Sequence, residues 1–275
     1  MIFTLIGILT RIVSNSLLNV FQKILTENGT KSSVVNFYTY AGLTILGLIF
    51  LPFIEISFSS SLLTNFLCMG ILGALGNYFI IKSLSIGELS SVAPINSYKP
   101  IVALVFAFIY LGEIPTLYAL LGIILIISGT YFLHKNILYN GKAVFYRALA
   151  LIFSAIEAVF IKQIIILTNI PASFFLWAFS GLIFSSFCIF NHKLTIPSAK
   201  HLVCLILSVG TMQYSTNFVF SRMNVSYALA LFQLSTLLSV FLGANIFHEK
   251  DLRNKVIASL IIIVGAIIFI LGGKI

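Results

Sequence analysis

The chain has 275 residues, of which 60% are hydrophobic and only 8% are charged, and its mean hydropathy is +1.11. A soluble domain carries about 25% charged residues, so this composition excludes a water-soluble protein and predicts an integral membrane protein. The formal net charge is +9, but no basic cluster suggests nucleic-acid binding. The Lys and Arg residues lie at the ends of apolar runs, where they suit anionic lipid head groups.

Ten apolar runs are long enough to span a membrane, because about 20 helical residues cross the roughly 30 Å hydrocarbon layer. They cover residues 2–25, 34–53, 62–82, 91–111, 116–134, 144–167, 171–190, 201–221, 226–247 and 254–271. The breaks between them are short and polar, so consecutive helices are expected to be antiparallel neighbours. The predicted fold class is therefore an all-α integral membrane bundle of ten transmembrane helices.

The two halves of the chain align with each other. A shift of 139 residues places Lys23 on Lys162, and a shift of 136 residues places Glu113 on Glu249. Each half carries five spans, an odd number, so the second half enters the membrane in the opposite sense. We therefore predict two inverted five-helix repeats, an arrangement typical of secondary transporters with a binding site between the halves. The first repeat covers residues 1–136 and the second covers residues 143–275.

The run from 91 to 111 carries a lysine, Lys99, near its middle. An ammonium group is costly at that depth and is expected to have a partner or a function. Pro94 and Pro100 each remove a backbone donor, so we expect the helix to bend around Asn96 and Lys99.

Glu157 is the one acidic residue predicted at a similar depth, and it belongs to the opposite half of the chain. We expect Lys99 and Glu157 to face one cavity, either as an ion pair or at opposite ends of a zwitterionic substrate. In the second case Lys99 binds the substrate carboxylate and Glu157 binds its ammonium group. The alternative is a buried ion pair that only fixes packing.

Other polar residues within the apolar runs complete the predicted site. Asn19 and Lys23 share one face of the first helix with Ser16, although interhelical hydrogen bonds explain such a stripe equally well. The only tryptophan, Trp177, is a weaker candidate for the cavity, because an interfacial anchor is the commoner role for such a ring. The predicted substrate-binding residues are Asn96, Tyr98, Lys99, Glu157, Asn19, Lys23, Asn77, Tyr78, Gln213, Tyr214 and Gln233.

Most basic residues outside the spans fall in the odd-numbered loops. These include Lys31, Lys142 and Lys200, and Arg147 is counted with them. The positive-inside rule would place these loops in the cytoplasm and both termini outside. No catalytic residues, metal ligands or cofactor are predicted, because the four histidines lie at span ends and no phosphate loop or nucleophile motif occurs. The protein is therefore not expected to be an enzyme.

The segment from Ala93 to Glu113, with Pro100 before the apolar run and Gly112 before the final glutamate, resembles the EamA-type transporters of the drug/metabolite transporter superfamily. Gly122 and Gly129 in the following run add to the resemblance. It implies two EamA-like repeats, a central cavity between helices 1, 3, 4, 6, 8 and 9, and alternating access. It also implies cytoplasmic termini, in conflict with the loop charges. Lys99 departs from the apolar or hydroxyl residue expected beside this proline, which suggests an anionic or zwitterionic substrate.

The leading functional prediction is a secondary transporter that exports a small polar, amino-acid-like metabolite across the inner membrane. One alternative is an importer of an anionic or nucleotide-type metabolite that uses Lys99, Lys23 and Arg11. Another is a non-transporting membrane scaffold. The expected partners are a small-molecule substrate and the lipid bilayer, with protons as a candidate coupling ion and no nucleic acid. The chain is expected to be a monomer or a homodimer.

Overall fold

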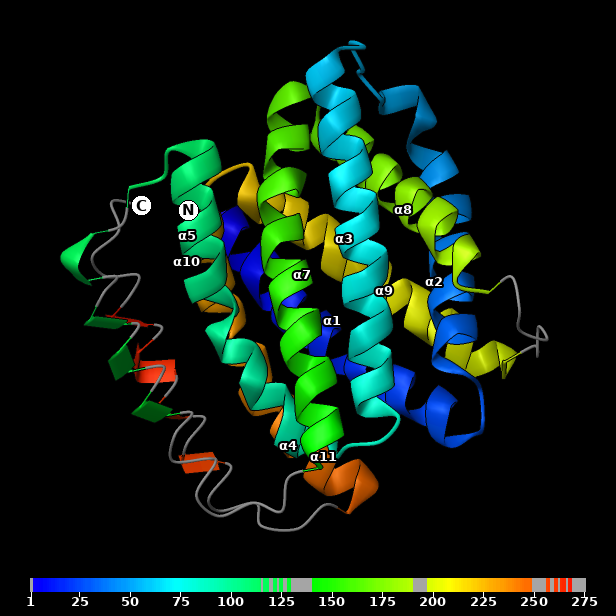
Figure 1. Cartoon of the computed structure of the whole chain (residues 1–275), viewed down its shortest axis with the longest axis vertical. Coiled ribbons are helices and arrows are strands. Elements are labelled where there is room, and N and C mark those ends of the chain that lie inside the picture. Colours follow the sequence, from blue (N-terminus) through cyan, green and yellow to red (C-terminus); the bar gives the residue numbers. More distant parts are fainter. Residues whose placement is uncertain are drawn as a thin grey trace.

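Figure 1 presents a computed structural model of the chain, in which helices pack side by side in one bundle. The structure describes residues 2–114, 116–118, 121–122, 124–125, 128–129, 140–189, 197–248, 256–257, 260–261, 263–265 and 267–268. All elements assigned within these ranges are helical, which confirms the all-α prediction. They are α1 (Ile2–Glu27), α2 (Ser32–Gly47), η1 (Leu48–Phe53), α3 (Ser60–Leu84), α4 (Leu89–Val92), η2 (Ala93–Tyr98), α5 (Lys99–Leu111), α7 (Gly141–Leu167), α8 (Ile170–Phe187), α9 (Ala199–Phe220), α10 (Val225–Phe232) and α11 (Leu234–Phe247).

Eight segments within these ranges are long and apolar enough to cross a membrane. They are Ile2–Glu27, Ser32–Phe53, Ser60–Leu84, Leu89–Leu111, Gly141–Leu167, Ile170–Phe187, Ala199–Phe220 and Val225–Phe247. Each corresponds to one of the predicted spans. The other two predicted spans, 116–134 and 254–271, lie partly outside the described residues, as does the predicted boundary at residue 136. The number of ten helices and the inverted repeat therefore remain predictions.

The fourth span is broken where the two prolines predict a bend. α4 gives way to the 3-10 helix η2 at Ala93, and the α-helix resumes as α5 at Lys99. Within this break the backbone N–H of Lys99 donates to the carbonyl of Asn96, three residues back. Pro100 cannot donate to that carbonyl, so the tighter 3-10 bond satisfies it instead. The helix is thus irregular where the prolines stand, and the side chains of Asn96 and Lys99 line the interior of the bundle.

The most extensive helix contacts are those of α3 with α7 and of α1 with α9. In Figure 1, α3 and α7 stand side by side at the front, with α1 and α9 behind them. The alignment of the two halves relates α1 to α7 and α3 to α9, so these two pairs would be equivalent. A small residue allows the close approach of α3 and α7: a Cβ added at Gly73 would overlap the side chain of Glu157 on α7.

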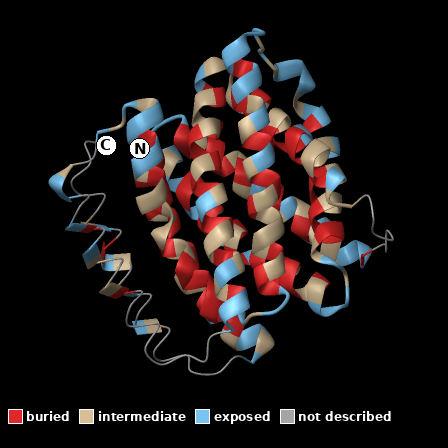
Figure 2. Cartoon of the chain, viewed as in Figure 1, coloured by how far each residue is buried: buried red, intermediate tan, exposed pale blue. Residues whose placement is uncertain are grey.

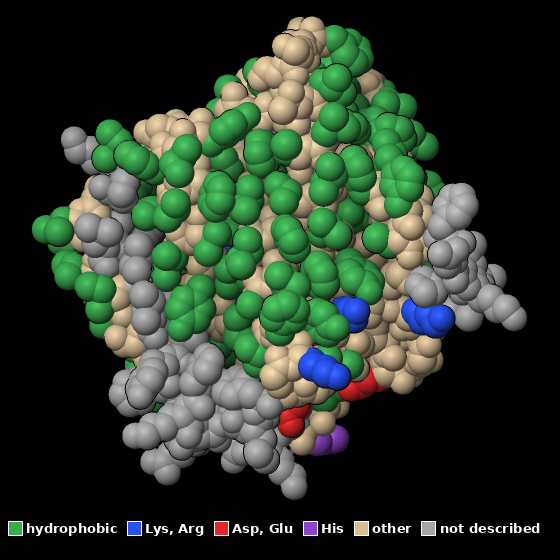
Figure 3. Space-filling model, viewed as in Figure 1, with side chains coloured by type: hydrophobic (Ala, Val, Ile, Leu, Met, Phe, Trp, Pro, Cys, Tyr) green, Lys and Arg blue, Asp and Glu red, His purple; other side chains and the backbone are tan. Residues whose placement is uncertain are grey.

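The outer surface of the bundle is apolar. Large hydrophobic side chains are exposed along the helices, among them Ile49, Ile71 and Ile109. Figure 2 shows buried residues concentrated along the inner faces, and Figure 3 shows hydrophobic side chains over most of the visible face. The Lys and Arg side chains visible in Figure 3 gather at one end of the molecule. This distribution is the one expected of a protein whose solvent is lipid.

A charged cluster joins the end of α5 to the second half of the chain. Gly112 ends α5 in the left-handed conformation (φ 68°), and Glu113 follows it. The Glu113 carboxylate lies 2.8 Å from the Lys162 ammonium on α7 and accepts bonds of 3.1 and 3.2 Å from the backbone N–H of Val225, the first residue of α10. Lys162 also donates to the carbonyl of Met223 at 2.9 Å. Glu113 therefore stabilises the positive end of the α10 dipole.

Candidate substrate-binding cavity

A cavity of about 90 Å³ lies at the centre of the bundle, with room for roughly six to nine water molecules at about 10–15 Å³ each. Most of its wall comes from α1, α3, α7 and α9, and η2, α5, α10, α2 and α8 contribute one residue each. All of these elements except α2 and α8 belong to the spans that the family resemblance places around a central cavity. Among the eleven predicted site residues, the following line it: Asn19, Asn77, Asn96, Lys99, Glu157 and Gln213.

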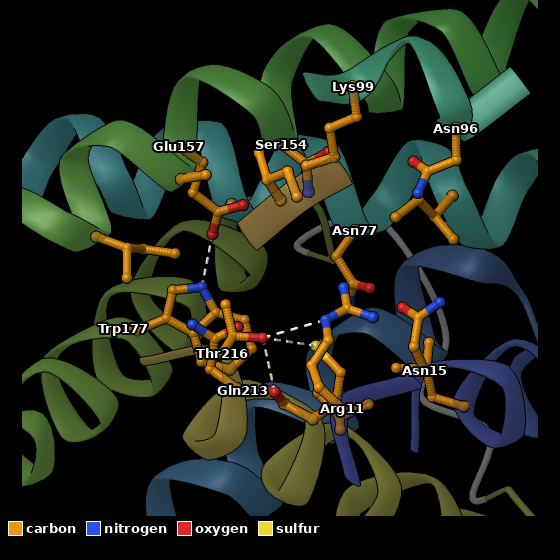
Figure 4. A pocket seen from close by; sticks show the side chains of 18 of the residues that line it. Arg11, Asn15, Asn77, Asn96, Lys99, Ser154, Glu157, Trp177, Gln213 and Thr216 are labelled. Carbon is orange, nitrogen blue, oxygen red and sulfur yellow. Dashed lines mark hydrogen bonds between the residues drawn. The ribbon is translucent and has the colours of Figure 1, made fainter. Parts of the chain in front are cut away.

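Lys99 and Glu157 face this cavity from α5 and α7, as expected, and Figure 4 shows their side chains directed toward the same space. Within the described part of the chain they do not form an ion pair within 4.0 Å. Lys99 nevertheless interacts electrostatically with Glu157, and also with Arg11 and Arg147. A closed salt bridge that only fixes packing is therefore not the arrangement present in this conformation.

The carboxylate of Glu157 is fixed by α8 and α3. Trp177 on α8 donates from Nε1 to Glu157 Oε1 at 2.5 Å, as the dashed line in Figure 4 marks. On α3, a Cβ added at Gly73 would overlap the same oxygen. Trp177 is buried among its neighbours, with its ring 5.2 Å from that of Tyr40. The commoner role of an interfacial anchor therefore does not apply to Trp177, because its indole serves a buried carboxylate.

Two arginines join Lys99 at the cavity wall. Arg11 on α1 donates from Nε to Thr216 Oγ1 at 3.2 Å, and its guanidinium lies 4.5 Å from the centre of the Phe232 ring. Arg147 on α7 is 4% exposed. The assignment of Arg147 to a polar loop is wrong: α7 begins at Gly141, which places Arg147 in the second turn of the helix, facing inward.

Amide side chains supply the neutral part of the wall. Asn77 accepts from Gln22 at 3.0 Å and donates to Asn36 at 2.6 Å, so α1, α2 and α3 share one hydrogen-bond chain. The side-chain amides of Gln213 and Asn217 lie 2.9 Å apart on α9. Bonds of this kind hold the cavity wall in place.

Asn19 and Asn96 line the cavity differently from Asn77. Among the described residues, neither makes a side-chain hydrogen bond with the protein. Their amides can therefore serve a bound solute, whereas that of Asn77 already has two partners.

The other predicted site residues lie elsewhere. Lys23 is 3.8 Å from Glu27 and stacks over the Phe247 ring at 4.5 Å. Gln233 is buried at the end of α10 and donates to the carbonyl of Leu229.

The three tyrosines of the predicted set also lie outside this cavity. Tyr78 and Tyr214 line two separate pockets, and Tyr214 stacks on Phe50 at a ring distance of 5.2 Å. Tyr98 is partly buried in η2 but is not part of the cavity wall. The predicted set does not include several lining residues: Arg147, Trp177, Ser154, Thr216, Tyr40 and Asn15.

Comparison with known proteins agrees with this architecture. Residues 2–134 match the model of the EamA-like transporter family. The first half of the chain therefore carries an EamA-like transporter unit. This match confirms the resemblance seen in the segment ending at Glu113 and is consistent with the drug/metabolite transporter superfamily. The class of protein that it supports is an EamA-like membrane transporter.

Solved structures show the same fold. One crystal structure of a protein is 16% identical in sequence, and the match covers 98% of this chain and 96% of that protein's chain with a TM-score of 0.72. At this identity the likeness concerns the fold alone. No curated protein sequence shows a significant match to the chain.

Proposed function

We propose that this protein is a secondary carrier that moves a small charged metabolite across the inner membrane by alternating access around the central cavity. The supporting observation is that Lys99 and Glu157, from opposite halves of the chain, line one cavity without forming an ion pair with each other. Charged groups that are buried without a close partner are costly in a membrane and commonly mark a substrate pathway.

An amino-acid-like solute suits this pair. Its carboxylate would bind Lys99 and its ammonium group would bind Glu157, while the amides of Asn19 and Asn96 are available for further hydrogen bonds. The volume of about 90 Å³ accommodates a solute of roughly six to nine non-hydrogen atoms if each takes the place of about one water. A nucleotide exceeds this size. The volume therefore favours amino-acid-like solutes over the nucleotide-type alternative in this conformation.

Counterflow in proteoliposomes tests the proposal. Vesicles that contain the purified protein are loaded with an unlabelled solute, and entry of the labelled solute is followed for panels of amino acids, sugars and nucleotides. We expect exchange of small amino acids, and we expect Lys99→Ala to abolish it. Lys142→Ala serves as the control, because Lys142 is exposed at the start of α7, outside the cavity. Exchange of no solute by a folded protein would contradict the proposal and favour a scaffold.

Direction and coupling need separate measurements. Export is tested in cells that are given a dipeptide, which they take up and hydrolyse to amino acids. Cells that express the protein should then contain less of these amino acids and release more of them into the medium than cells that express the Lys99→Ala variant. A proton gradient imposed on the proteoliposomes shows whether protons are coupled. Acceleration of net transport by the gradient supports proton coupling, and exchange that is indifferent to the gradient supports facilitated exchange.

A further inference from the structure

The cavity wall carries more positive than negative charge. Arg11, Lys99 and Arg147 stand against the single carboxylate of Glu157, so three positive charges minus one negative charge leave a formal excess of two. The four groups lie close enough for Lys99 to interact electrostatically with the other three. An amino-acid zwitterion adds no net charge and would leave this excess uncompensated.

The arginines retain hydrogen-bond donors that nothing in the described part of the chain accepts. Nε and Nη1 of Arg147, and Nη1 of Arg11, are buried without a partner. Both residues are more than nine-tenths buried. A guanidinium group presents its N–H bonds in a rigid fork that fits carboxylate, phosphate or sulfonate oxygens, and a buried donor without a partner costs about 1–3 kcal/mol. An anionic ligand would reduce this excess of positive charge and would accept hydrogen bonds from the unpaired donors.

Arg11 is positioned for such a ligand by contacts at its other side. Its Nε donates to Thr216 and its Cζ lies over the Phe232 ring, so the guanidinium is held in place while Nη1 stays unpaired. Arg147 approaches from α7, the helix that also carries Glu157. The positions are ten residues apart, so that about 15 Å of helix separates the Arg147 backbone from that of Glu157. Their side chains can thus serve different ends of one solute.

We propose that the substrate is a small amino acid with a second anionic group, so that it carries a net charge of about −1 at neutral pH. This inference rests on the proposed transport function of the cavity. The α-carboxylate and ammonium group bind Lys99 and Glu157, and the second anionic group binds Arg147 and Arg11. A molecule the size of aspartate, with about nine non-hydrogen atoms, is at the upper limit of the cavity volume of about 90 Å³.

Matched solutes separate charge from shape in the counterflow assay. Aspartate and asparagine are nearly isosteric, as are glutamate and glutamine, and succinate lacks the ammonium group. We expect the acidic amino acids to exchange roughly tenfold or more faster than their amides, which corresponds to about 1.4 kcal/mol of discrimination. Asparagine exchanging as fast as aspartate would overturn the inference and leave the proposed function standing. Succinate exchanging as fast as aspartate would overturn the amino-acid part, and no exchange of any solute would overturn both.

Variants of Arg147 test the role of the second anionic group. Arg147→Gln should slow aspartate exchange roughly tenfold and change asparagine exchange by less than about twofold, since only aspartate loses a charge partner. Arg147→Lys keeps the charge and should recover part of the aspartate rate. Arg222→Gln is the matched control, because Arg222 is exposed and lies outside the cavity. Equal loss for both solutes in a variant that remains monodisperse and thermally stable in detergent, or no loss at all, would overturn the inference.

Discussion

The position of the Glu157 carboxylate depends on Gly73, which has no side chain. Gly73 on α3 leaves the space that Glu157 Oε1 occupies, and a Cβ at this position would overlap that oxygen. On α8, Trp177 donates a hydrogen bond to the same oxygen. The carboxylate is thus held between α3 and α8, and one methyl group is enough to displace it.

We expect Gly73→Ala to slow counterflow by roughly tenfold or more, equivalent to about 1.4 kcal/mol of lost binding. The change should not unfold the protein, because Ala favours a helix interior over Gly by about 0.5–1 kcal/mol. Gly76→Ala is the matched control: it lies one turn further along α3, and its added Cβ would meet its nearest neighbour at 3.4 Å, an ordinary contact. Equal transport by the two variants would show that the position of Glu157 is unimportant.

Trp177→Phe should lower the thermal stability of the protein in detergent. The substitution removes the donor to Glu157 and leaves a buried carboxylate oxygen without its partner, at a cost of about 1–3 kcal/mol. A double-mutant cycle isolates this interaction from loss of the indole ring. In a Glu157→Leu background, which has no carboxylate, Trp177→Phe should cost less. The same cost in both backgrounds would mean that the hydrogen bond contributes nothing.

Several site residues could be predicted because a charged or amide group stood inside an apolar run, as Lys99, Glu157 and Asn96 do. The repeat alignment of Asn77-Tyr78 with Gln213-Tyr214 predicts both tyrosines as site residues, but successive helical residues point about 100° apart, so the tyrosines leave the cavity face.

Arg147 and Trp177 could not be found by the same criterion. Arg147 lies near a polar link, and Trp177 has a type of side chain common at membrane interfaces. Their burial depends on which helices surround them, and sequence periodicity does not specify those neighbours.

At the scale of the helical elements, the break in the fourth span positions part of the site. The two prolines of the segment, Pro94 and Pro100, account for the 3-10 turn between α4 and α5. In the second half of the chain, the helix is interrupted at Gln233, between α10 and α11, and this interruption contains no proline. The first break could be predicted from proline chemistry. The second could not, because it has no comparable local signal.

The Glu113 cluster gives a prediction at the same scale. Glu113→Ala should lower the free energy of unfolding by about 3–5 kcal/mol, because it leaves Lys162 without its carboxylate and the first N–H of α10 without an acceptor. The measurement is the unfolding temperature in detergent. Glu55→Ala is the control, since Glu55 is exposed in the link between η1 and α3. Equal unfolding temperatures for the two variants would contradict a stabilising role for the cluster.

At the scale of the whole molecule, the bundle turns polar groups inward and apolar groups outward, the reverse of a soluble protein. Composition and the length of the apolar runs were sufficient to predict the membrane class and all eight candidate spans within the described residues. The arrangement of these spans around one cavity was implied by the family resemblance. The pattern of apolar and polar residues alone does not predict which helices are neighbours, because helix faces that contact lipid and faces that contact protein are both apolar.

The lipid-facing surface can be tested at Ile71, which is 42% exposed near the centre of α3. Ile71→Asp should sharply reduce the amount of protein in the membrane, because an acidic residue at the centre of a span costs about 2.5–3.5 kcal/mol on insertion. Ile71→Ala should be tolerated, since little packing is lost at an exposed site. Normal membrane levels of the Asp variant would place this face against water or protein.

Trp177 is the only tryptophan in the chain, and its indole lines the cavity in contact with Glu157. The intrinsic fluorescence of the unlabelled protein under excitation selective for indole therefore originates at the proposed binding site. A solute that approaches Glu157 changes the polarity and hydrogen bonding of that single fluorophore. Equilibrium titration in detergent can thus report occupancy directly, independently of vesicle orientation and of transport itself.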